Sequence, residues 1–258
     1  MVRGLDSFIA YFKAFPGNYL IIGGTARDII MEDAGFEPKG TKDIDMILVV
    51  EALTTEFVMQ FWQFVLDGNY EHQEKSSSKP QYYRFYNPGI KAFPDMIELF
   101  SRRPEAVLLN EPAHLTPIPV EAELVSLSAI LLSDDYYNYI LTHSYIDENE
   151  VHLANTESLI CLKARAFNDM TARKAQGENI DSKKIQKHKS DIFRLAVTLT
   201  TADVFELPQT LKSDLQKFVA ATADNLPGKE LFKALGLGTI DPQDVLNQIL
   251  KSFQLDGK

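Results

Sequence analysis

The segment 19–50 constrains the fold of this 258-residue chain most strongly, because it joins apolar runs to a glycine turn. Its first run, Tyr19–Ile22, predicts a buried strand that ends at two glycines, and residues 26–33 predict a short helix. A strand, a glycine turn and a helix start bring backbone N–H groups together, which favours phosphate binding. An ordinary structural turn is the alternative. The residues expected to bind phosphate are Gly23, Gly24, Thr25 and Arg27.

A second apolar run, Asp43–Val50, begins with two acids, Asp43 and Asp45. Side chains two residues apart in a strand point to the same face, so both carboxylates should project together. Carboxylates this close repel each other unless a cation lies between them, and hard divalent ions suit oxygen ligands. We therefore expect one or two Mg²⁺ ions here. The alternative is a turn role for these acids, or a surface ion pair between Asp43 and Lys42.

Two further acids compete to be the third carboxylate of this site. Asp95 and Glu98 are three residues apart in a predicted strand, so they face opposite ways and only one can join. Glu98 lies between Ile97 and Leu99, where an unpaired carboxylate would be costly. Asp95 follows a proline, where a turn role is natural. We predict Asp43, Asp45 and Glu98 as metal ligands, because three carboxylates can hold ions that activate a hydroxyl and steady a leaving pyrophosphate.

The character of the sequence changes near residue 155, from short apolar runs to longer helical patterns. We predict an α+β protein: a domain 1–155 with a mixed β-sheet and flanking helices, then an all-helical domain 156–258. The expected elements of the first domain, beyond the segment above, are a helix at 4–15, a helix capped by Thr54 or Thr55, a solvated loop at 70–80, strands at 82–86, 95–100 and 151–153, an unassigned stretch at 104–123, a buried segment at 124–132 and a short helix at 136–141. In the second domain we expect helices at 156–170, 182–199, 209–221, 228–235 and 242–253, with a hydrophilic linker at 171–182.

Lys163 extends from an apolar stripe of its predicted helix. The residues three and four positions away are Leu159, Ile160, Ala166 and Phe167. Its ammonium should therefore either reach solvent or meet an anion. On the next predicted helix, Lys187 and Asp191 share a face with Lys184 and Arg194; a solvated face with i,i+4 pairs is the alternative there.

The strand ending in Gly-Gly, the Asp-x-Asp pair and the third acid resemble the nucleotidyltransferase superfamily with polymerase-β-like folds. The motifs GGTARD and KDIDM also resemble the head domain of CCA-adding enzymes and bacterial poly(A) polymerases. Those enzymes carry an RRDFT-type element after the third acid, and residues 101–104 depart from it. LICLKARAFNDM (159–170) and KKIQKHKSDIFRL (183–195) are similar to the helical motifs of AbiEii-type nucleotidyltransferases, the toxins of abortive-infection toxin–antitoxin pairs.

The AbiEii resemblance covers about residues 18–200 and implies a Mg²⁺-dependent enzyme that moves an NMP from an NTP to an acceptor hydroxyl. The acceptor would be an RNA or tRNA end or a protein, and a cognate antitoxin would be a partner. By the same resemblance, Lys163, Lys187 and Asp191 complete the site. The chain departs from the family at Lys187-His188, where a Lys-Asp step is usual, and at Gly24-Thr25, where Gly-Ser is usual. The resemblance assigns no role to residues 200–258.

A formal net charge of -10 argues against non-specific binding to nucleic acid or anionic membranes. The start of the chain does not resemble a signal peptide, and its one cysteine fits a reducing compartment, so we expect a cytoplasmic protein without a membrane partner. Two alternative functions remain: a small-molecule, antibiotic-type nucleotidyltransferase, and a non-catalytic nucleotide-binding or protein-interaction module.

Overall fold

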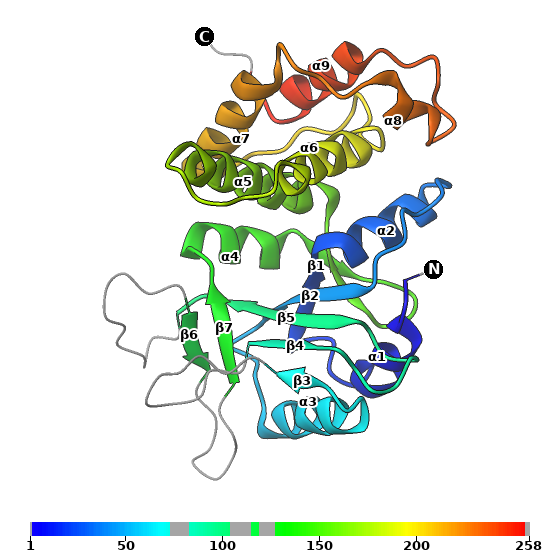
Figure 1. Ribbon diagram of the computed structural model, residues 1–258, viewed down its shortest axis with the longest axis vertical. Helices are drawn as coiled ribbons and strands as arrows, with labels where there is room; N and C mark the ends of the chain where they lie inside the picture. The colour runs from blue at the N-terminus through cyan, green and yellow to red at the C-terminus, as the bar shows by residue number, and fades with distance from the viewer. Residues whose placement is uncertain (1, 73–82, 104–114, 119–126, 256–258) are drawn as a thin grey trace. The chain divides into compact units, whose positions relative to one another are not determined.

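The chain is an α+β protein with a mixed β-sheet, as the sequence predicts (Figure 1). The computed structural model describes residues 2–72, 83–103, 115–118 and 127–255. The chain divides into two compact units, the first made of Met1–Ile29 and Lys39–Ala154 and the second of Ile30–Pro38 and Asn155–Lys258. Among the described residues, no helix is both long enough and apolar enough to cross a membrane.

The sheet belongs to the first unit. Its described strands are β1 Tyr19–Ile22, β2 Asp43–Leu48, β3 Glu71–His72, β4 Arg84–Tyr86, β5 Met96–Ser101, β6 Leu115–Ile118, β7 Leu127–Leu131, β8 Ser144–Ile146 and β9 His152–Ala154. They follow the order β3-β4-β5-β2-β1-β9-β8, and β7 pairs with both β5 and β6. The central strand β2 runs antiparallel to β1 and parallel to β5, which makes the sheet mixed.

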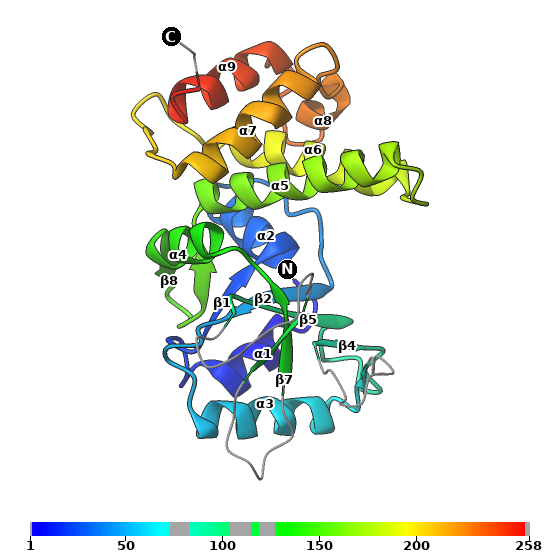
Figure 2. The ribbon, with the colours of Figure 1, turned by 90° about the vertical axis from the view of Figure 1, so that its left-hand side faces the viewer.

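Helices α1 (Leu5–Phe12) and α3 (Thr55–Asp67) lie on one face of this sheet (Figures 1 and 2). Aromatic side chains form the core between these helices and the sheet. The Phe8 ring lies 5.2 Å from that of Tyr19 on β1, and Phe12 lies 5.2 Å from Phe64 on α3. Such tilted and edge-on pairs add about 0.5–1.5 kcal/mol each to the burial of the rings. Thr54 caps α3 by accepting a hydrogen bond from the Phe57 amide at 3.2 Å.

The register of the strands places the candidate acids on the other face. Tyr19, which faces the aromatic core, is the Cα partner of Leu48. Leu48, Met46 and Ile44 therefore face α1 and α3. Asp43 and Asp45 point to the opposite face. The apolar remainder of β2, from Met46 to Leu48, is buried, as its uninterrupted hydrophobicity predicts.

Two further helices, α2 and α4, each follow a strand of the sheet in the sequence. Helix α2 (Gly23–Asp33) follows β1 with no intervening loop and runs from the first unit into the segment Ile30–Pro38 of the second. Helix α4 (Asp134–Thr142) belongs to the first unit. It buries Tyr136 and Tyr137, and the Tyr137 hydroxyl accepts a hydrogen bond from the Val50 amide at 3.0 Å.

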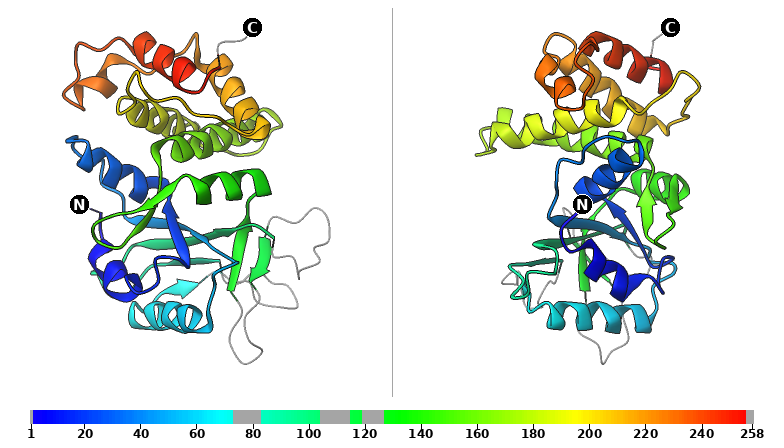
Figure 3. Two further views of the ribbon diagram at one scale, coloured as in Figure 1. Left: turned by 180° about the vertical axis from the view of Figure 1, so that it is seen from behind. Right: turned by 90° about the vertical axis from the view of Figure 1, so that its right-hand side faces the viewer.

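The described part of the second unit is helical, apart from its loops. Its further helices are α5 Thr156–Ala175, α6 Ser182–Ala196, α7 Gln209–Thr222, α8 Lys229–Lys233 and α9 Pro242–Ser252. Helix α5 packs against both α6 and α7, with the ring of Phe167 5.1 Å from that of Phe218 (Figure 3). Asp181 and Asp241 cap α6 and α9 through hydrogen bonds from the second residue of each helix.

Helix α5 is longer than the sequence predicts. It continues to Ala175, so the prediction of a linker over residues 171–182 is wrong for the first five of these residues. The extension consists mostly of good helix formers, and Arg173 pairs with Asp169 one turn earlier at 3.2 Å. The sequence does not predict strand β8, and the prediction of a loop over 70–80 is wrong for Glu71 and His72, which form β3 by pairing with β4. Most of the predicted loop at 70–80 and of the unassigned stretch at 104–123, and the start of the segment 124–132, lie outside the described residues.

Candidate functional site

The predicted glycine turn is present, and it lies directly against the predicted acid pair. Gly23 begins α2 with a positive φ of 72°, which favours glycine. A Cβ atom at this position would overlap Oδ2 of Asp45 and would lie 2.8 Å from its Cγ. Only a residue without a side chain therefore fits here. The consequence is that the backbone of the first turn of α2 touches the Asp45 carboxylate.

The next two residues fix this turn to β2. A Cβ atom on Gly24 would lie 2.8 Å from Oγ1 of Thr41, so glycine is needed for close approach here as well. The hydroxyl of Thr25 is fully buried and donates a hydrogen bond to the main-chain oxygen of Asp43 at 2.7 Å. Thr25 thus joins the turn to the acid-bearing strand. A phosphate at this turn would be bound by backbone N–H groups, since the Thr25 hydroxyl is already used.

The three predicted carboxylates occupy neighbouring positions on one face of the sheet. Asp45 on β2 and Glu98 on β5 are Cα partners in a parallel ladder, and Asp43 is the partner of Met96. Adjacent strands lie about 4.7–4.9 Å apart, and register partners point to the same side. All three acids are half-buried. The row therefore brings three carboxylates together next to the glycine turn.

The carboxylate of Glu98 is bound by an arginine that the sequence prediction missed. Arg84 on β4 is the Cα partner of Glu98, and its Nε donates to Oε1 at 2.6 Å while Nη2 donates to the same oxygen. The side chain of Glu98 is 13% exposed and that of Arg84 is 38% exposed. The position of Glu98 inside an apolar run indicates that a cation lies near it. The sequence does not show that this cation is Arg84, because that depends on the pairing of β4 with β5.

This ion pair affects the predicted metal centre. Within the described residues, no group of at least three His, Cys, Asp or Glu side chains is arranged to hold a metal ion. The chemistry of the donors suits Mg²⁺, because Asp43 and Asp45 supply hard oxygen ligands on one face. Glu98 has the right position in the ladder, but its carboxylate is engaged by Arg84. Its role as third ligand stays a prediction.

The competing acid, Asp95, has partners of its own. Arg3 lies 2.7 Å and Lys42 lies 3.8 Å from its carboxylate oxygens. Asp95 directly precedes β5 and lies outside the ladder in which Glu98 is the partner of Asp45. The surface ion pair considered for Lys42 is therefore made with Asp95.

Arg27, predicted as a phosphate ligand, is buried in the helix that follows the turn. It is 2% exposed, and its Nε donates a hydrogen bond to Oδ1 of Asp28 at 2.8 Å. Asp28 is fully buried as well, and its Oδ2 has no hydrogen-bond partner in the described part of the chain. Arg27 is thus bound to a buried acid of its own helix, and its role as a phosphate ligand stays a prediction.

The remaining predicted site residues lie in the second unit. Lys163 on α5 is buried, and its Nζ lies 3.1 Å from Oδ2 of Asp191 on α6, which is fully buried. Lys163 therefore meets an anion rather than solvent, and that anion is Asp191. The sequence predicts both residues as site residues but pairs Asp191 with Lys187, so the ion pair with Lys163 is a new observation. Lys187 is exposed.

His188 lies beside this buried ion pair. Burial, and then the positive charge of Lys163, lower the pKa of His188 to about 4, against an opposing effect of Asp191. Its imidazole is therefore neutral at pH 7, and its buried Nδ1 has no hydrogen-bond partner among the described residues.

No match was found in comparisons with protein-family models, with curated proteins or with solved structures.

Proposed function

We propose that this protein is a Mg²⁺-dependent nucleotidyltransferase that moves an NMP from an NTP to an acceptor hydroxyl. The observation that carries the proposal is the contact between Gly23 and Asp45. It puts a helix N-terminus, which suits phosphate oxygens, next to a carboxylate pair that suits a divalent cation. Nucleotide transfer needs both at one place.

In the proposed reaction, an acceptor hydroxyl attacks the α-phosphorus of the NTP. A new bond forms between the acceptor oxygen and this phosphorus, and the bond to the bridging oxygen of the pyrophosphate breaks. Asp43 or Asp45 accepts the proton of the hydroxyl, and the backbone of Gly23 and Gly24 holds the triphosphate. A bound Mg²⁺ would supply positive charge that neutralises the phosphates.

Three residues of the second unit, Lys163, Lys187 and Asp191, are also part of this proposal. Lys163 would contact the triphosphate, with Asp191 holding its ammonium in position, and Lys187 would add a further positive charge. Since Asp191 already neutralises Lys163, this role requires the ammonium to bind both anions through its three N–H groups. The acceptor class proposed from the family resemblance is an RNA or tRNA end or a protein, with a cognate antitoxin as partner.

The test incubates purified full-length protein with Mg²⁺, each α-labelled NTP and either total tRNA or cell extract. Label on RNA or on protein would identify the acceptor, and label on a small molecule would support the antibiotic-type alternative. Asp45→Asn should lower transfer by more than about a hundredfold while leaving the circular dichroism spectrum unchanged. Asp95→Asn is the matched control and should retain transfer. Full activity of Asp45→Asn would contradict the proposed site.

One observation favours a second candidate, a non-catalytic nucleotide-binding module. The ion pair between Arg84 and Glu98 neutralises the third acid of the row. A protein that only binds a nucleotide has no need of a third carboxylate as a metal ligand. Saturable NTP binding without transfer of label to any acceptor would support this candidate over the enzyme.

A further inference from the structure

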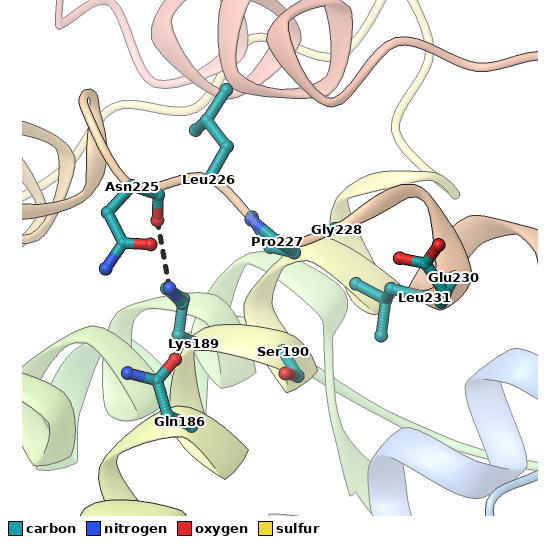
Figure 4. Close-up of a pocket in the computed structure, with 9 residues that line it drawn as sticks. All are labelled: Gln186, Lys189, Ser190, Asn225, Leu226, Pro227, Gly228, Glu230 and Leu231. Atoms are coloured by element: carbon teal, nitrogen blue, oxygen red, sulfur yellow. Dashed lines mark hydrogen bonds between the residues drawn. The ribbon is translucent and has the colours of Figure 1, made fainter.

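An open pocket of about 510 Å³ lies within the second unit, between α6 and the segment that leads into α8 (Figure 4). This volume falls in the range of about 300–1,000 Å³ that is typical of small-molecule sites. The lining residues are Gln186, Lys189, Ser190, Asn225, Leu226, Pro227, Gly228, Glu230 and Leu231. None of them is assigned to the proposed nucleotide transfer, so the pocket is independent of that proposal.

Lys189 is the buried cation of this pocket. It is 5% exposed, and its Nζ donates a hydrogen bond of 2.9 Å to the main-chain oxygen of Asn225. Within the described residues no carboxylate pairs with it. An ammonium has three N–H donors, so a single neutral acceptor leaves its charge uncompensated. Burial lowers the pKa of Lys189, because desolvation disfavours its charged form.

The surroundings of Lys189 supply the rest of a binding site. The hydroxyl of Ser190 and the amides of Gln186 and Asn225 can donate further hydrogen bonds, and Leu226 adds an apolar wall. Figure 4 shows the Glu230 carboxylate on the far side of the pocket from the Lys189 ammonium. A ligand with a small anionic group at one end would pair with the lysine and keep away from this acid.

We propose that this pocket binds a small ligand through a phosphate or carboxylate group that pairs with Lys189. The anion would occupy the N–H donors of Lys189 that Asn225 leaves open, and the neutral part of the ligand would lie toward Leu226. The alternative is structural, in which Lys189 only holds the main-chain oxygen of Asn225 beyond the C-terminal end of α7.

The test titrates full-length protein with inorganic phosphate, and separately with acetate, by isothermal titration calorimetry at an ionic strength fixed with sodium chloride. Wild-type protein should bind at least one of these anions in a saturable way. Lys189→Met, which keeps the apolar stem of the side chain, should weaken binding roughly tenfold or more. Lys183→Met removes an exposed lysine from the same helix and should bind as the wild type does.

Stronger binding of phosphate would identify a phosphate ester as the ligand class, and stronger binding of acetate a carboxylic acid. No saturable binding of either anion by wild-type protein, or equal affinity in Lys189→Met, would overturn the proposal. A second readout needs no variant. Titration of lysine Cε signals by NMR should show the pKa of Lys189 rising when phosphate is added, because an anion stabilises the charged form. An unchanged pKa would also overturn it.

Discussion

Asp45 and Glu98 are Cα partners on adjacent parallel strands, and their carboxylates have different neighbours. Asp45 has the backbone of Gly23 against it, whereas Glu98 is bound by the guanidinium of Arg84. The two acids share a face of the sheet, and the guanidinium of Arg84 is already bound to the Glu98 carboxylate. A cation that uses Glu98 as a ligand would have to compete with Arg84.

Replacing Arg84 by glutamine should tighten the binding of Mn²⁺, used as a spectroscopic substitute for Mg²⁺. The variant frees the Glu98 carboxylate and removes one positive charge from the row of acids. At the effective dielectric of a protein surface this is worth about 1 kcal/mol or more, or roughly a fivefold to tenfold change in affinity. Electron paramagnetic resonance of free Mn²⁺ measures it.

Arg3→Gln is the control for this experiment, because Arg3 pairs with Asp95 in the same way. If Asp95 were the third ligand, Arg3→Gln would be the variant that gains affinity. An unchanged Mn²⁺ affinity in Arg84→Gln would argue that Glu98 is not a metal ligand.

Alanine at position 23 should destabilise the protein by at least about 2 kcal/mol in urea denaturation. The change places a Cβ on a backbone with φ of 72° and in overlap with Asp45. Gly35→Ala separates the two causes, since Gly35 has a φ of 80° but a Cβ added there would have no atom within 4 Å. It should cost about 1 kcal/mol. Equal losses in both variants would mean that the contact with Asp45 is not important for stability.

Breaking the buried ion pair between Lys163 and Asp191 should reduce the free energy of unfolding by about 3–5 kcal/mol for either single change, Lys163→Met or Asp191→Leu. The double variant should lose less than the sum, because no uncompensated charge is then left buried. Urea denaturation of the four proteins gives the coupling energy. Lys187→Met, at an exposed position, should change stability by less than about 0.5 kcal/mol. Additive losses would show that the pair is not coupled.

The stability of the protein should depend on pH through His188. Its pKa is about 4 in the folded protein, below the ordinary value of 6.5. The unfolded chain therefore binds a proton more readily, so the stability that His188 contributes is complete above about pH 7 and is lost as the pH falls through 6.5 toward 4. The difference in unfolding free energy between pH 7 and pH 5 should shrink by about 2 kcal/mol in His188→Gln. Identical pH profiles for variant and wild type would contradict the buried, neutral histidine.

Much of the local structure could be predicted from the sequence, because it depends on local patterns. The apolar run before Gly23 and the run after Asp45 are both strands, and the prediction of an α+β protein with a mixed sheet is confirmed. Strand β8 was missed because its three residues have no strong pattern of their own and are ordered by pairing with β9. The sequence predicts too early an end for α5, because the polar residues of its last turn are also typical of a linker.

The candidate site was only partly visible in the sequence, for a similar reason. The closeness of Gly23 to Asp45 follows from the register of β1 and β2, in which Ile22 is the Cα partner of Asp45. The pairing of Arg84 with Glu98 depends on a register between β4 and β5, which no local pattern encodes. Lys163 and Asp191 were predicted from family resemblance, but not as an ion pair. The buried Lys189 gave no signal, since it reads as one lysine among several on α6.

The segment Ile30–Pro38 has a consequence for how the chain folds. It belongs with the second unit, yet more than one hundred residues of the first unit lie between it and Asn155. During synthesis this segment therefore emerges early and cannot complete its contacts until the helices after residue 155 have been made. Cutting the chain after residue 154 would separate the segment Ile30–Pro38 from the rest of the second unit. The second unit should thus be the later of the two to reach its native state.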